Sequence, residues 1–282
     1  MNSYRLGVSL LAALTMFTVS ACSSDAETEK APAPSTSSPA PNPDSVRTQL
    51  DRAVDQTARK YHAKVGVAIS AGDDTIAVGD KGKGPVWSTI KVPIAIAALK
   101  DGADKSLVDL AIKESDNDAA YSLWSQVQWR EGSADKAVEE LLEDYGSHAD
   151  IHDTAFGYST WSLKDQAVFG AELPCIEEAD YVHKVLKDIV SWQKIGLSKE
   201  NRTRAKSGWG LDEDDNEYTY RQFGVHEVAG KRVGVALSVV TDGEDYAKAE
   251  PAVKYLAHEL VDIVDKGVEK GNIEPAAQCK DS

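Results

Sequence analysis

Residues 87–100 read WSTIKVPIAIAALK, and this stretch determines how the rest of the chain is interpreted. After Lys91 the side chains are apolar in every direction around a helix, which predicts a helix buried on all sides. Pro93 fits this helix if the helix begins just upstream, where the missing N–H is not needed. Ser88 and Lys91 are three residues apart and therefore share one helix face. The sequence thus places a serine hydroxyl beside a lysine amine at the start of a buried helix.

A serine and a lysine in this arrangement can form a nucleophile. The neutral amine takes the hydroxyl proton, provided that burial and neighbouring cations keep the lysine partly neutral. The same Ser-x-x-Lys spacing recurs at residues 133–136 and 191–194, where we predict ordinary helix surface. Only the copy at Ser88 follows a two-strand segment and opens an apolar helix, so we assign the chemistry to that copy.

Hydrophobic periodicity around this stretch predicts an α/β (α+β) fold in which a helical block interrupts a sheet. We expect the α/β part to comprise residues 46–90 and 200–275, and the helical part residues 91–199. The predicted helices are 45–61, 107–112, 134–145, 162–173, 181–195 and 247–268. The predicted strands are 64–70, 75–78, 203–208, 220–228 and 232–240, with a turn at Asp73-Asp74.

Two further motifs follow in a fixed order. Ser115-Asp116-Asn117 falls in the helical block, and Lys206-Ser207-Gly208 falls on a predicted strand. The three motifs together resemble the serine-reactive penicillin-recognising superfamily, which contains class A β-lactamases, penicillin-binding proteins and DD-peptidases. The resemblance covers about residues 46–270 and is strongest for class A-like domains. It implies a β-lactamase/transpeptidase-like fold, with an antiparallel sheet flanked by helices and an inserted all-helical subdomain.

The resemblance also implies a catalytic role for five residues. Ser88 would attack the carbonyl carbon of a D-Ala-D-Ala-like peptide or a β-lactam, and Lys91 would activate it. Ser115 would relay a proton to the leaving nitrogen. Asn117 would hold Lys91 and the substrate amide. Lys206 would supply positive potential near Ser115 and the substrate carboxylate.

Substrate binding is implied for residues of the third motif and the next strand. Ser207 would donate a hydrogen bond to the substrate carboxylate, and Gly208 would let the substrate approach the strand. The backbone N–H groups of Ser88 and Trp209 would form an oxyanion hole. Arg221 would add to carboxylate binding.

The chain departs from class A β-lactamases where that family carries its deacylating glutamate. Residues 147–158 (SHADIHDTAFGY) contain no glutamate. By comparison with the family this segment is roughly a dozen residues too short. Because the glutamate activates the water that hydrolyses the acyl-enzyme, efficient β-lactamase activity is not expected. A substitute base would have to be Asp150, His152 or Asp153.

No cofactor and no metal are expected. His148 and His152 are four residues apart beside Asp150 and Asp153, but a polar surface loop is favoured over a metal site. The acidic run 212–217 (DEDDNE) lacks the glycine and the distal glutamate of a calcium loop, so a solvated turn is predicted there.

The N-terminal segment predicts the cellular location of the protein. In residues 1–21, Arg5 precedes an apolar stretch of signal-peptide length. Val19-Ser20-Ala21-Cys22 resembles the lipobox of bacterial lipoproteins, in which the cysteine carries the lipid, although an ordinary signal peptide is the alternative. Residues 22–45 are rich in Pro, Ala and Ser and predict an extended tether. We expect an extracytoplasmic protein, lipid-anchored to the bacterial cell membrane.

The net charge restricts the classes of binding partner, and the cysteine content restricts the possible disulfides. The 282 residues include 31 Lys and Arg and 46 Asp and Glu, a net charge of −15. Such a chain has no electrostatic footprint for nucleic acid and is not drawn to anionic membrane surfaces. With Cys22 lipidated, Cys175 and Cys279 are the one possible disulfide pair, which would close a loop of about 105 residues. Two unpaired thiols are the alternative.

Two functions fit these observations. The first is a serine acyl-transfer enzyme acting on cell-wall peptide or a related amide or ester, with poor or no β-lactam turnover. The second is a catalytically silent lipoprotein that binds peptidoglycan or a protein partner. The three intact motifs favour the enzyme. The short loop favours the silent protein, as do Trp87 and Trp209, which would stack on a ligand or narrow the cleft. We expect a monomer and favour the enzyme.

Overall fold

The computed structural model describes residues 42, 45–243, 246–277 and 279. The predicted signal peptide, Cys22 and all of the predicted tether except Asn42 and Ser45 lie outside the described residues. Five strands are long: β1 (Lys64–Ala71), β2 (Asp74–Gly79), β5 (Thr203–Asp212), β6 (Glu217–Val228) and β7 (Lys231–Asp242). They form one sheet in the order β2-β1-β7-β6-β5, antiparallel throughout. Two short strands, β3 (Ala149–Asp150) and β4 (Thr160–Trp161), pair separately.

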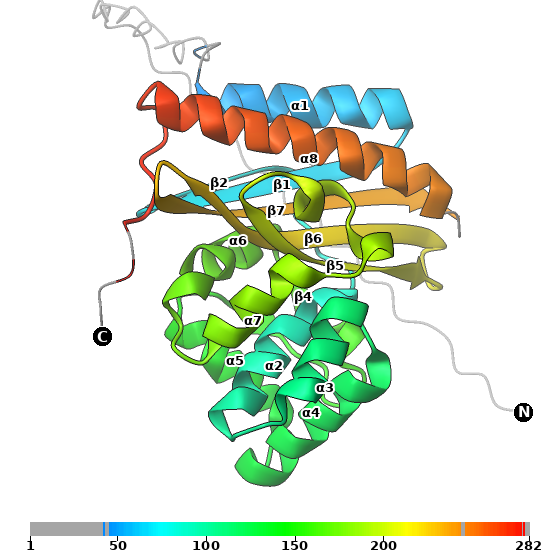
Figure 1. Cartoon of the computed structure of the whole chain (residues 1–282). Helices are drawn as coiled ribbons and strands as arrows, with labels where there is room; N and C mark the ends of the chain where they lie inside the picture. The colour runs from blue at the N-terminus through cyan, green and yellow to red at the C-terminus, as the bar shows by residue number, and fades with distance from the viewer. Residues whose placement is uncertain (1–41, 43–44, 244–245, 278, 280–282) are drawn as a thin grey trace, which may run out of the picture. The chain divides into compact units, whose positions relative to one another are not determined.

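Helices cover both faces of the sheet, as Figure 1 shows. Helices α1 and α8 lie together over one face, and the remaining helices lie on the other side. The predicted α+β fold, an antiparallel sheet flanked by helices, is confirmed. The helices are α1 (Val46–Tyr61), α2 (Lys91–Lys100), α3 (Lys105–Asp109), α4 (Asn117–Glu131), α5 (Ala134–Asp144), α6 (Leu163–Glu172), α7 (Ala179–Val185) and α8 (Tyr246–Glu269).

Alternation along the strands divides the core into two layers. Odd-numbered residues of β1 and β7, such as Val67 and Leu237, pack against α1 and α8. Even-numbered residues, such as Ala68 and Ala236, pack against the helical block. Successive strand residues point to opposite faces, so the pairing register assigns each residue of β5 and β6 to a face. Lys206 is opposite Phe223 and lies on the side of the helical block, whereas Ser207 is opposite Gln222 and lies on the side of α1 and α8. We call the two sides the α1/α8 face and the helical-block face.

The stretch around residue 91 forms a buried helix, as predicted. Eight consecutive residues of α2, from Lys91 to Ala98, are buried. A short 3-10 turn, Trp87–Ile90, leads directly into α2, so Pro93 lies in the first turn, where its missing N–H costs little. Helix α2 contacts α4, α5 and α7, and it therefore forms the centre of the helical block.

The structure differs from the prediction at several elements. Helix α4 was not predicted, although Ala120, Leu123, Trp124 and Val127 have helical spacing and are buried. The predicted helix at 181–195 ends at Val185 and continues as 3-10 turns, because the chain becomes extended around residues 189–190. The turn between β1 and β2 consists of residues 72 and 73 rather than Asp73-Asp74, with glycine at φ +55°.

A disulfide joins Cys175 to Cys279, which confirms the predicted pair. Cys175 ends a 3-10 turn that follows α6, and Cys279 lies in the C-terminal tail. Ala276 of that tail bridges to Arg232 at the start of β7. The disulfide therefore ties the C-terminal tail to the helical block, and the bridge at Ala276 ties it to the sheet. In the part of the chain that the structure describes, no helix combines the length and apolarity needed to span a bilayer.

Candidate active site

Ser88 is the second residue of the 3-10 turn that precedes α2, and its backbone lies against the edge strand β5. Its backbone carbonyl accepts a hydrogen bond from the Lys91 N–H. Ser88 is half-buried, and within the described residues no hydrogen bond holds its Oγ. The preceding residue, Trp87, has φ +50°, which is unusual for a residue with a side chain. The turn therefore presents a free serine hydroxyl from a conformation that its surroundings must maintain.

Lys91 reaches from α2 to the second motif, which joins the end of the helical turn at 110–114 to α4. Its Nζ donates to Asn117 Oδ1 at 2.7 Å and to the Ser115 carbonyl at 2.5 Å. Burial lowers the pKa of Lys91 to about 8, while the nearby charge of Asp116 opposes that shift. A fraction of the Lys91 side chains is therefore neutral near pH 7, the form in which an amine acts as a base.

Lys206 approaches Ser115 from the opposite side. It points from β5 toward the helical-block face and is fully buried. Its Nζ donates to Ser115 Oγ at 2.9 Å, to Gln193 Oε1 at 3.3 Å and to the Ser207 carbonyl at 2.9 Å. Burial, and then the positive charge of Lys91, lower the pKa of Lys206 well below its ordinary value. Lys91 Nζ lies 3.4 Å from the same Ser115 Oγ, so one hydroxyl connects the two amines.

The structure thus brings together the catalytic residues predicted from the three motifs: Lys91, Ser115, Asn117 and Lys206 meet beside the turn that carries Ser88. Gln193 was missed by the sequence analysis. It is buried and also donates to the Lys113 carbonyl at 3.1 Å. No pattern in the sequence distinguishes Gln193 from a surface residue, because its contacts depend on how residues 186–199 fold back.

Gly208 has a different neighbour from the one expected. A Cβ at this position would lie 2.7 Å from Ser88 N and 2.8 Å from the Val86 carbonyl oxygen. Similarly, a Cβ at Gly210 would lie 2.8 Å from three ring atoms of Trp87. Both positions therefore require glycine, because the nucleophile turn and the Trp87 ring pack directly against the strand. The contact does place the Ser88 backbone beside β5, which an oxyanion hole shared with Trp209 requires.

Ser207, predicted to bind a substrate carboxylate, faces away from Ser88. It points to the α1/α8 face and is 2% exposed. Its Oγ accepts a hydrogen bond from Gln222 Nε2 at 2.7 Å. Gln222 is opposite Ser207 in the β5–β6 register and also donates to the Ile195 carbonyl. The hydroxyl is therefore covered and engaged within the protein.

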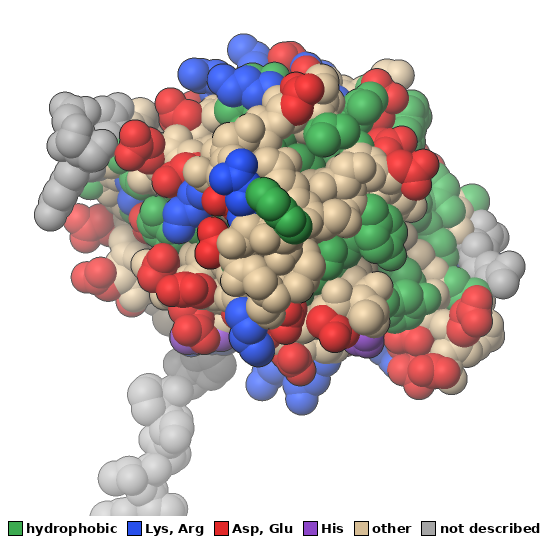
Figure 2. Space-filling view, turned by 90° about the horizontal axis from the view of Figure 1, so that it is seen from below, with side chains coloured by type: hydrophobic (Ala, Val, Ile, Leu, Met, Phe, Trp, Pro, Cys, Tyr) green, Lys and Arg blue, Asp and Glu red, His purple; other side chains and the backbone are tan. Residues whose placement is uncertain are grey.

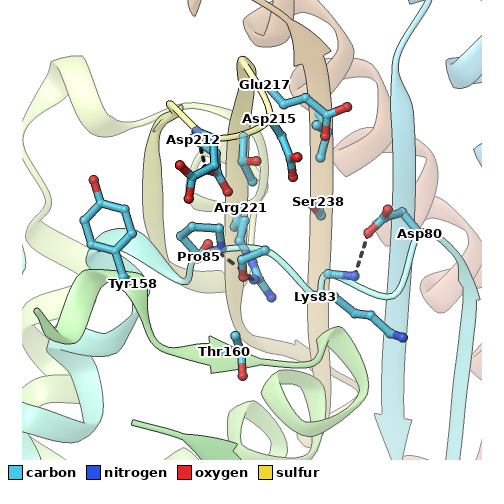
Figure 3. Close-up of a pocket in the computed structure, with 15 residues that line it drawn as sticks. Asp80, Lys83, Pro85, Tyr158, Thr160, Asp212, Asp215, Glu217, Arg221 and Ser238 are labelled. Atoms are coloured by element: carbon cyan, nitrogen blue, oxygen red, sulfur yellow. Dashed lines mark hydrogen bonds between the residues drawn. The ribbon is translucent and has the colours of Figure 1, made fainter. Parts of the chain in front are cut away.

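Arg221 was also predicted to bind the carboxylate. In the structure its guanidinium donates hydrogen bonds to backbone carbonyls of two other segments. It is fully buried on the helical-block face. Its Nη1 donates to the Gly84 carbonyl at 2.7 Å, and its Nη2 to the Trp161 carbonyl at 2.5 Å. Arg221 lines a cavity of about 460 Å³. Figure 3 shows it there with other lining residues, among them Asp80 and Glu217. Two of its N–H groups therefore hold residue 84 and β4, while its buried Nε has no hydrogen-bond partner among the described residues.

Replacement of Arg221 by methionine is expected to lower the free energy of unfolding by about 1–3 kcal/mol, because the buried Trp161 carbonyl loses its donor. Urea unfolding followed by circular dichroism measures this change. Arg52→Met, at an exposed position of α1, is the matched control and is expected to have little effect. A stability loss in Arg221→Met no larger than in the control would contradict the anchoring role.

The cleft around Ser88 has a volume of about 330 Å³ and is largely aromatic. The rings of Trp87 and Tyr158 lie 5.2 Å apart, and those of Tyr121 and Phe156 lie 4.7 Å apart. No Asp, Glu or His is among the described residues that line the cleft. Those residues are Trp87, Ser88, Lys91, Asn117, Tyr121, Ala155, Phe156, Gly157, Tyr158 and Trp209.

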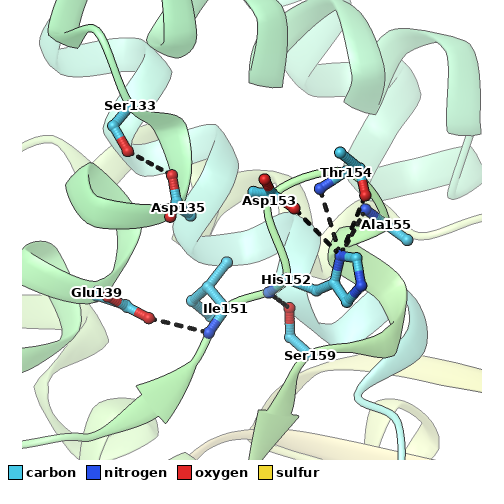
Figure 4. Close-up of polar contacts among 9 residues, drawn as sticks. All are labelled: Ser133, Asp135, Glu139, Ile151, His152, Asp153, Thr154, Ala155 and Ser159. Carbon is cyan, nitrogen blue, oxygen red and sulfur yellow. Dashed lines mark hydrogen bonds and ion pairs between the residues drawn. The ribbon is translucent and has the colours of Figure 1, made fainter.

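The three candidate substitute bases lie elsewhere. His152 Nδ1 accepts from the Ala155 N–H at 3.1 Å and contacts Asp153 at 3.6 Å, as Figure 4 shows. Asp150 borders a separate pocket together with His148. No group of three or more His, Cys, Asp or Glu is positioned to hold a metal ion in the described ranges. None of the three residues is among the described residues that line the cleft around Ser88.

No protein-family model and no curated protein matches this sequence. Solved structures do match it. A class A β-lactamase from Bacteroides cellulosilyticus DSM 14838 is similar with a TM-score of 0.65 at 13% identity, covering 79% of this chain and 99% of that chain. A β-lactamase from Chitinophaga pinensis DSM 2588 has a TM-score of 0.61 at 15% identity, covering 77% and 99%.

PBP-A is similar with a TM-score of 0.57 at 17% identity, covering 78% of this chain and 97% of that chain. A variant of PBP-A, solved as an acyl-enzyme complex with penicillin G, has a TM-score of 0.58 at the same identity. At this level of identity the similarity establishes the fold. The described part of the chain has the fold shared by class A β-lactamases and PBP-A, in agreement with the resemblance seen in its three motifs.

Proposed function

We propose that this protein is a serine acyl-transfer enzyme in which Ser88 is the nucleophile and Lys91 its base. The observation that carries the proposal is the meeting of two buried lysines at Ser115 Oγ, beside a serine whose hydroxyl is free. Burying two amines in contact with one hydroxyl is costly, since desolvation and mutual repulsion both disfavour their charged forms. A purely structural role does not account for that arrangement, whereas a proton-transfer chain does.

In the proposed reaction, neutral Lys91 takes the Ser88 proton as Oγ bonds to the carbonyl carbon of the substrate. The oxyanion that forms is stabilised by the backbone N–H groups of Ser88 and Trp209. As the bond to the leaving group breaks, Ser115 donates a proton to the leaving atom and recovers one from Lys91. Lys206 keeps the Ser115 hydroxyl oriented. The products are an ester on Ser88 and the protonated leaving group.

Deacylation is proposed to be slow. Hydrolysis of the ester needs a base that takes a proton from water, and a positioned base is worth about 100- to 10,000-fold in rate. The cleft around Ser88 offers no carboxylate or imidazole within the described residues. Lys91 is left as the nearest base, so β-lactam turnover should be poor.

The setting proposed for this reaction is the cell envelope. A lipid at Cys22 and a spacer over residues 22–45 would hold a monomeric domain close to the bacterial membrane. Stem peptides of peptidoglycan that end in D-Ala-D-Ala, and the β-lactams that mimic them, are the corresponding substrates. The lipid is tested by palmitate labelling of wild type and Cys22→Ser in the producing cell, where we expect labelling of the wild type alone.

The chemical proposal is tested by intact-protein mass spectrometry after incubation with millimolar penicillin G and, separately, with a fluorophosphonate that labels reactive serines. We expect both adducts on the wild type, with the penicillin adduct forming slowly and persisting for hours. Neither adduct should form on Ser88→Ala. If neither reagent labels the wild type at Ser88, the enzymatic proposal is wrong.

A catalytically silent binding protein is the second candidate. It is favoured by the burial of Ser207 and by the contact of the Trp87 indole with Gly210, which occupies space beside the strand. Such a protein would bind soluble peptidoglycan fragments without a covalent adduct. Calorimetry with wild type and Ser88→Ala distinguishes the two, since equal affinity and no adduct would support the silent protein.

A further inference from the structure

We infer that the cavity of Figure 3 is a second binding site, and that its ligand is an amino sugar with a free amine. The volume of about 460 Å³ lies within the range of pockets that hold small organic molecules. Among the described residues, Tyr158 is the one that lines both this cavity and the cleft around Ser88. The inference therefore goes beyond the chemistry proposed for Ser88 and does not depend on it.

Strands β6 and β7 form the floor of the cavity. Thr219 and Arg221 are two residues apart on β6, so both side chains point to the helical-block face. Ser238 of β7 is opposite Arg221 in the strand register and points the same way. Residues 82–85 and Thr160 of β4 also line the cavity, and the turn between β5 and β6 contributes acidic side chains at one end, as Figure 3 shows.

Three polar groups of the floor have no hydrogen-bond partner in the part of the chain that the structure describes. They are Arg221 Nε, Ser238 Oγ and the Thr219 hydroxyl. Thr219 is 5% exposed and is the first of the three that a ligand meets, because Ser238 and Arg221 are 1% and 0% exposed. Buried polar groups in native proteins are almost always paired. The floor therefore supplies two hydroxyl groups and one N–H donor for the polar groups of a ligand.

The charged side chains that line the cavity are mostly acidic: Asp80, Asp212, Asp214, Asp215 and Glu217, against Lys83 and Arg221. Glu217 is paired with Lys64. Within the described residues, no lysine or arginine forms an ion pair with Asp212, Asp214 or Asp215, and Asp212 accepts a hydrogen bond from the Asp214 N–H. A carboxylate accepts hydrogen bonds and donates none, so the ligand must supply donors. The excess of negative charge favours a cation among them.

An amino sugar supplies each of these groups. Its ammonium donates to the carboxylates, and its hydroxyl groups both donate and accept, as the floor requires. A simple amine would leave Arg221 Nε without an acceptor, and a neutral sugar would leave the carboxylates without a charged donor. Tyr158 borders the cavity and is 52% exposed, so its ring is open to the apolar face of a sugar.

The charge of the whole molecule favours the same ligand. Acidic side chains are spread over the face seen in Figure 2, and the chain has a net charge of −15. A field of this sign raises the local concentration of a cation and lowers that of an anion. The approach to the protein and the lining of the cavity therefore select for the same charge.

Three disaccharides of matched size test the inference by isothermal titration calorimetry. They are the disaccharide of glucosamine with both amines free, its di-N-acetyl derivative, and cellobiose, which carries hydroxyl groups in place of the amines. At a pH where the amines are charged, we expect the glucosamine disaccharide to bind at least about fivefold more tightly than the other two, since an exposed ion pair contributes a factor of this order. Equal affinities, or no saturable binding of the glucosamine disaccharide, would overturn the inference.

The floor of the cavity is tested with a matched pair of threonine variants. Thr219→Val removes the hydroxyl at almost constant volume and should weaken binding of the glucosamine disaccharide about fivefold, the order expected for one hydrogen bond. Thr241→Val is the control, because Thr241 is also buried without a hydrogen-bond partner but lies on β7 facing α1 and α8. It should bind like the wild type. Wild-type affinity in Thr219→Val would show that the ligand does not occupy this floor.

The acidic end has a test of its own. The double variant Asp212→Asn/Asp215→Asn should lose the preference for the glucosamine disaccharide over cellobiose, because both side chains lose their charge. Asp51→Asn, at an exposed position of α1, should keep it. A preference that persists in the double variant would contradict recognition of the amine by these carboxylates.

Binding in the cavity must also be independent of the nucleophile. Ser88 is not among the residues that line the cavity, so Ser88→Ala should bind the glucosamine disaccharide with wild-type affinity. Loss of binding in Ser88→Ala would place the sugar in the Ser88 cleft and overturn the second site. Labelling of Ser88 by the fluorophosphonate, or its failure, decides the enzymatic proposal alone.

Discussion

Replacement of Lys91 by methionine is expected to lower the rate of Ser88 acylation by about 100- to 10,000-fold, the range for loss of a positioned general base. Lys91 follows Ser88 by three residues at the junction of the 3-10 turn and α2, and its Nζ donates to the Ser115 carbonyl and to Asn117 Oδ1. Methionine is of similar length and is uncharged, so it fits the buried site. The fold should therefore persist while the proton acceptor is lost.

The pH dependence of acylation tests the same role. Burial lowers the pKa of Lys91 to about 8, and only the neutral amine accepts the Ser88 proton. Below that pKa the neutral fraction rises tenfold with each pH unit, so the wild-type rate should rise with pH and level off above about pH 8. The rate at which the penicillin G adduct forms on Ser88, measured by mass spectrometry over a range of pH, gives the profile. For Lys91→Met, the acylation rate should show no increase with pH that has a midpoint near pH 8.

Lys136→Met is the matched control, since Lys136 also follows a serine by three residues but is exposed in a helix-surface pair with Glu139. It should acylate at the wild-type rate with the same pH profile. Circular dichroism must show that both variants are folded. Acylation of folded Lys91→Met at the wild-type rate would remove Lys91 from the mechanism and direct attention to Lys206.

Most of the architecture could be predicted from local patterns in the sequence. The all-round apolar stretch after Lys91 predicted a buried helix, and α2 is buried along eight consecutive residues. The resemblance carried by the three motifs implied that the buried helix, the helical block and a returning strand would meet. Helix α4 was missed even though Ala120, Leu123 and Val127 show the spacing that was used for other helices. The sequence therefore contains the apolar spacing that predicts α4.

The details of ligand binding could not be predicted in the same way. Strand alternation alone places Ser207 on the face opposite Lys206. The engagement of Ser207 depends on Gln222, which is its partner only because of the β5–β6 register. The same register puts Arg221 opposite Gly208, beside the 80–85 segment whose carbonyl it binds. Pairing between distant segments decides these contacts, so motif spacing cannot provide them.

Removal of the disulfide is expected to have the largest effect on stability. The bond joins residues separated by 104 positions in the chain. In the chain-entropy model, closing a loop of that length in the unfolded state is worth about 4–5 kcal/mol. The double variant Cys175→Ala/Cys279→Ala should therefore lower Tm by about 8–20 °C, given the usual sensitivity of a domain of this size. A double variant is needed because a single one leaves a free thiol able to form a mixed disulfide.

Calorimetry of the double variant and of reduced wild type should give the same lowered Tm, since both open the same loop. The prediction holds only if the C-terminal tail stays folded until the domain unfolds. The contacts of Ala276 and Arg232 tie the tail to β7 and favour that cooperative behaviour. If the tail detached separately, the main transition would move by less than about 2 °C, because the open loop would then cost the folded domain little. The size of the shift therefore distinguishes a tail that stabilises the whole domain from one that is merely attached to it.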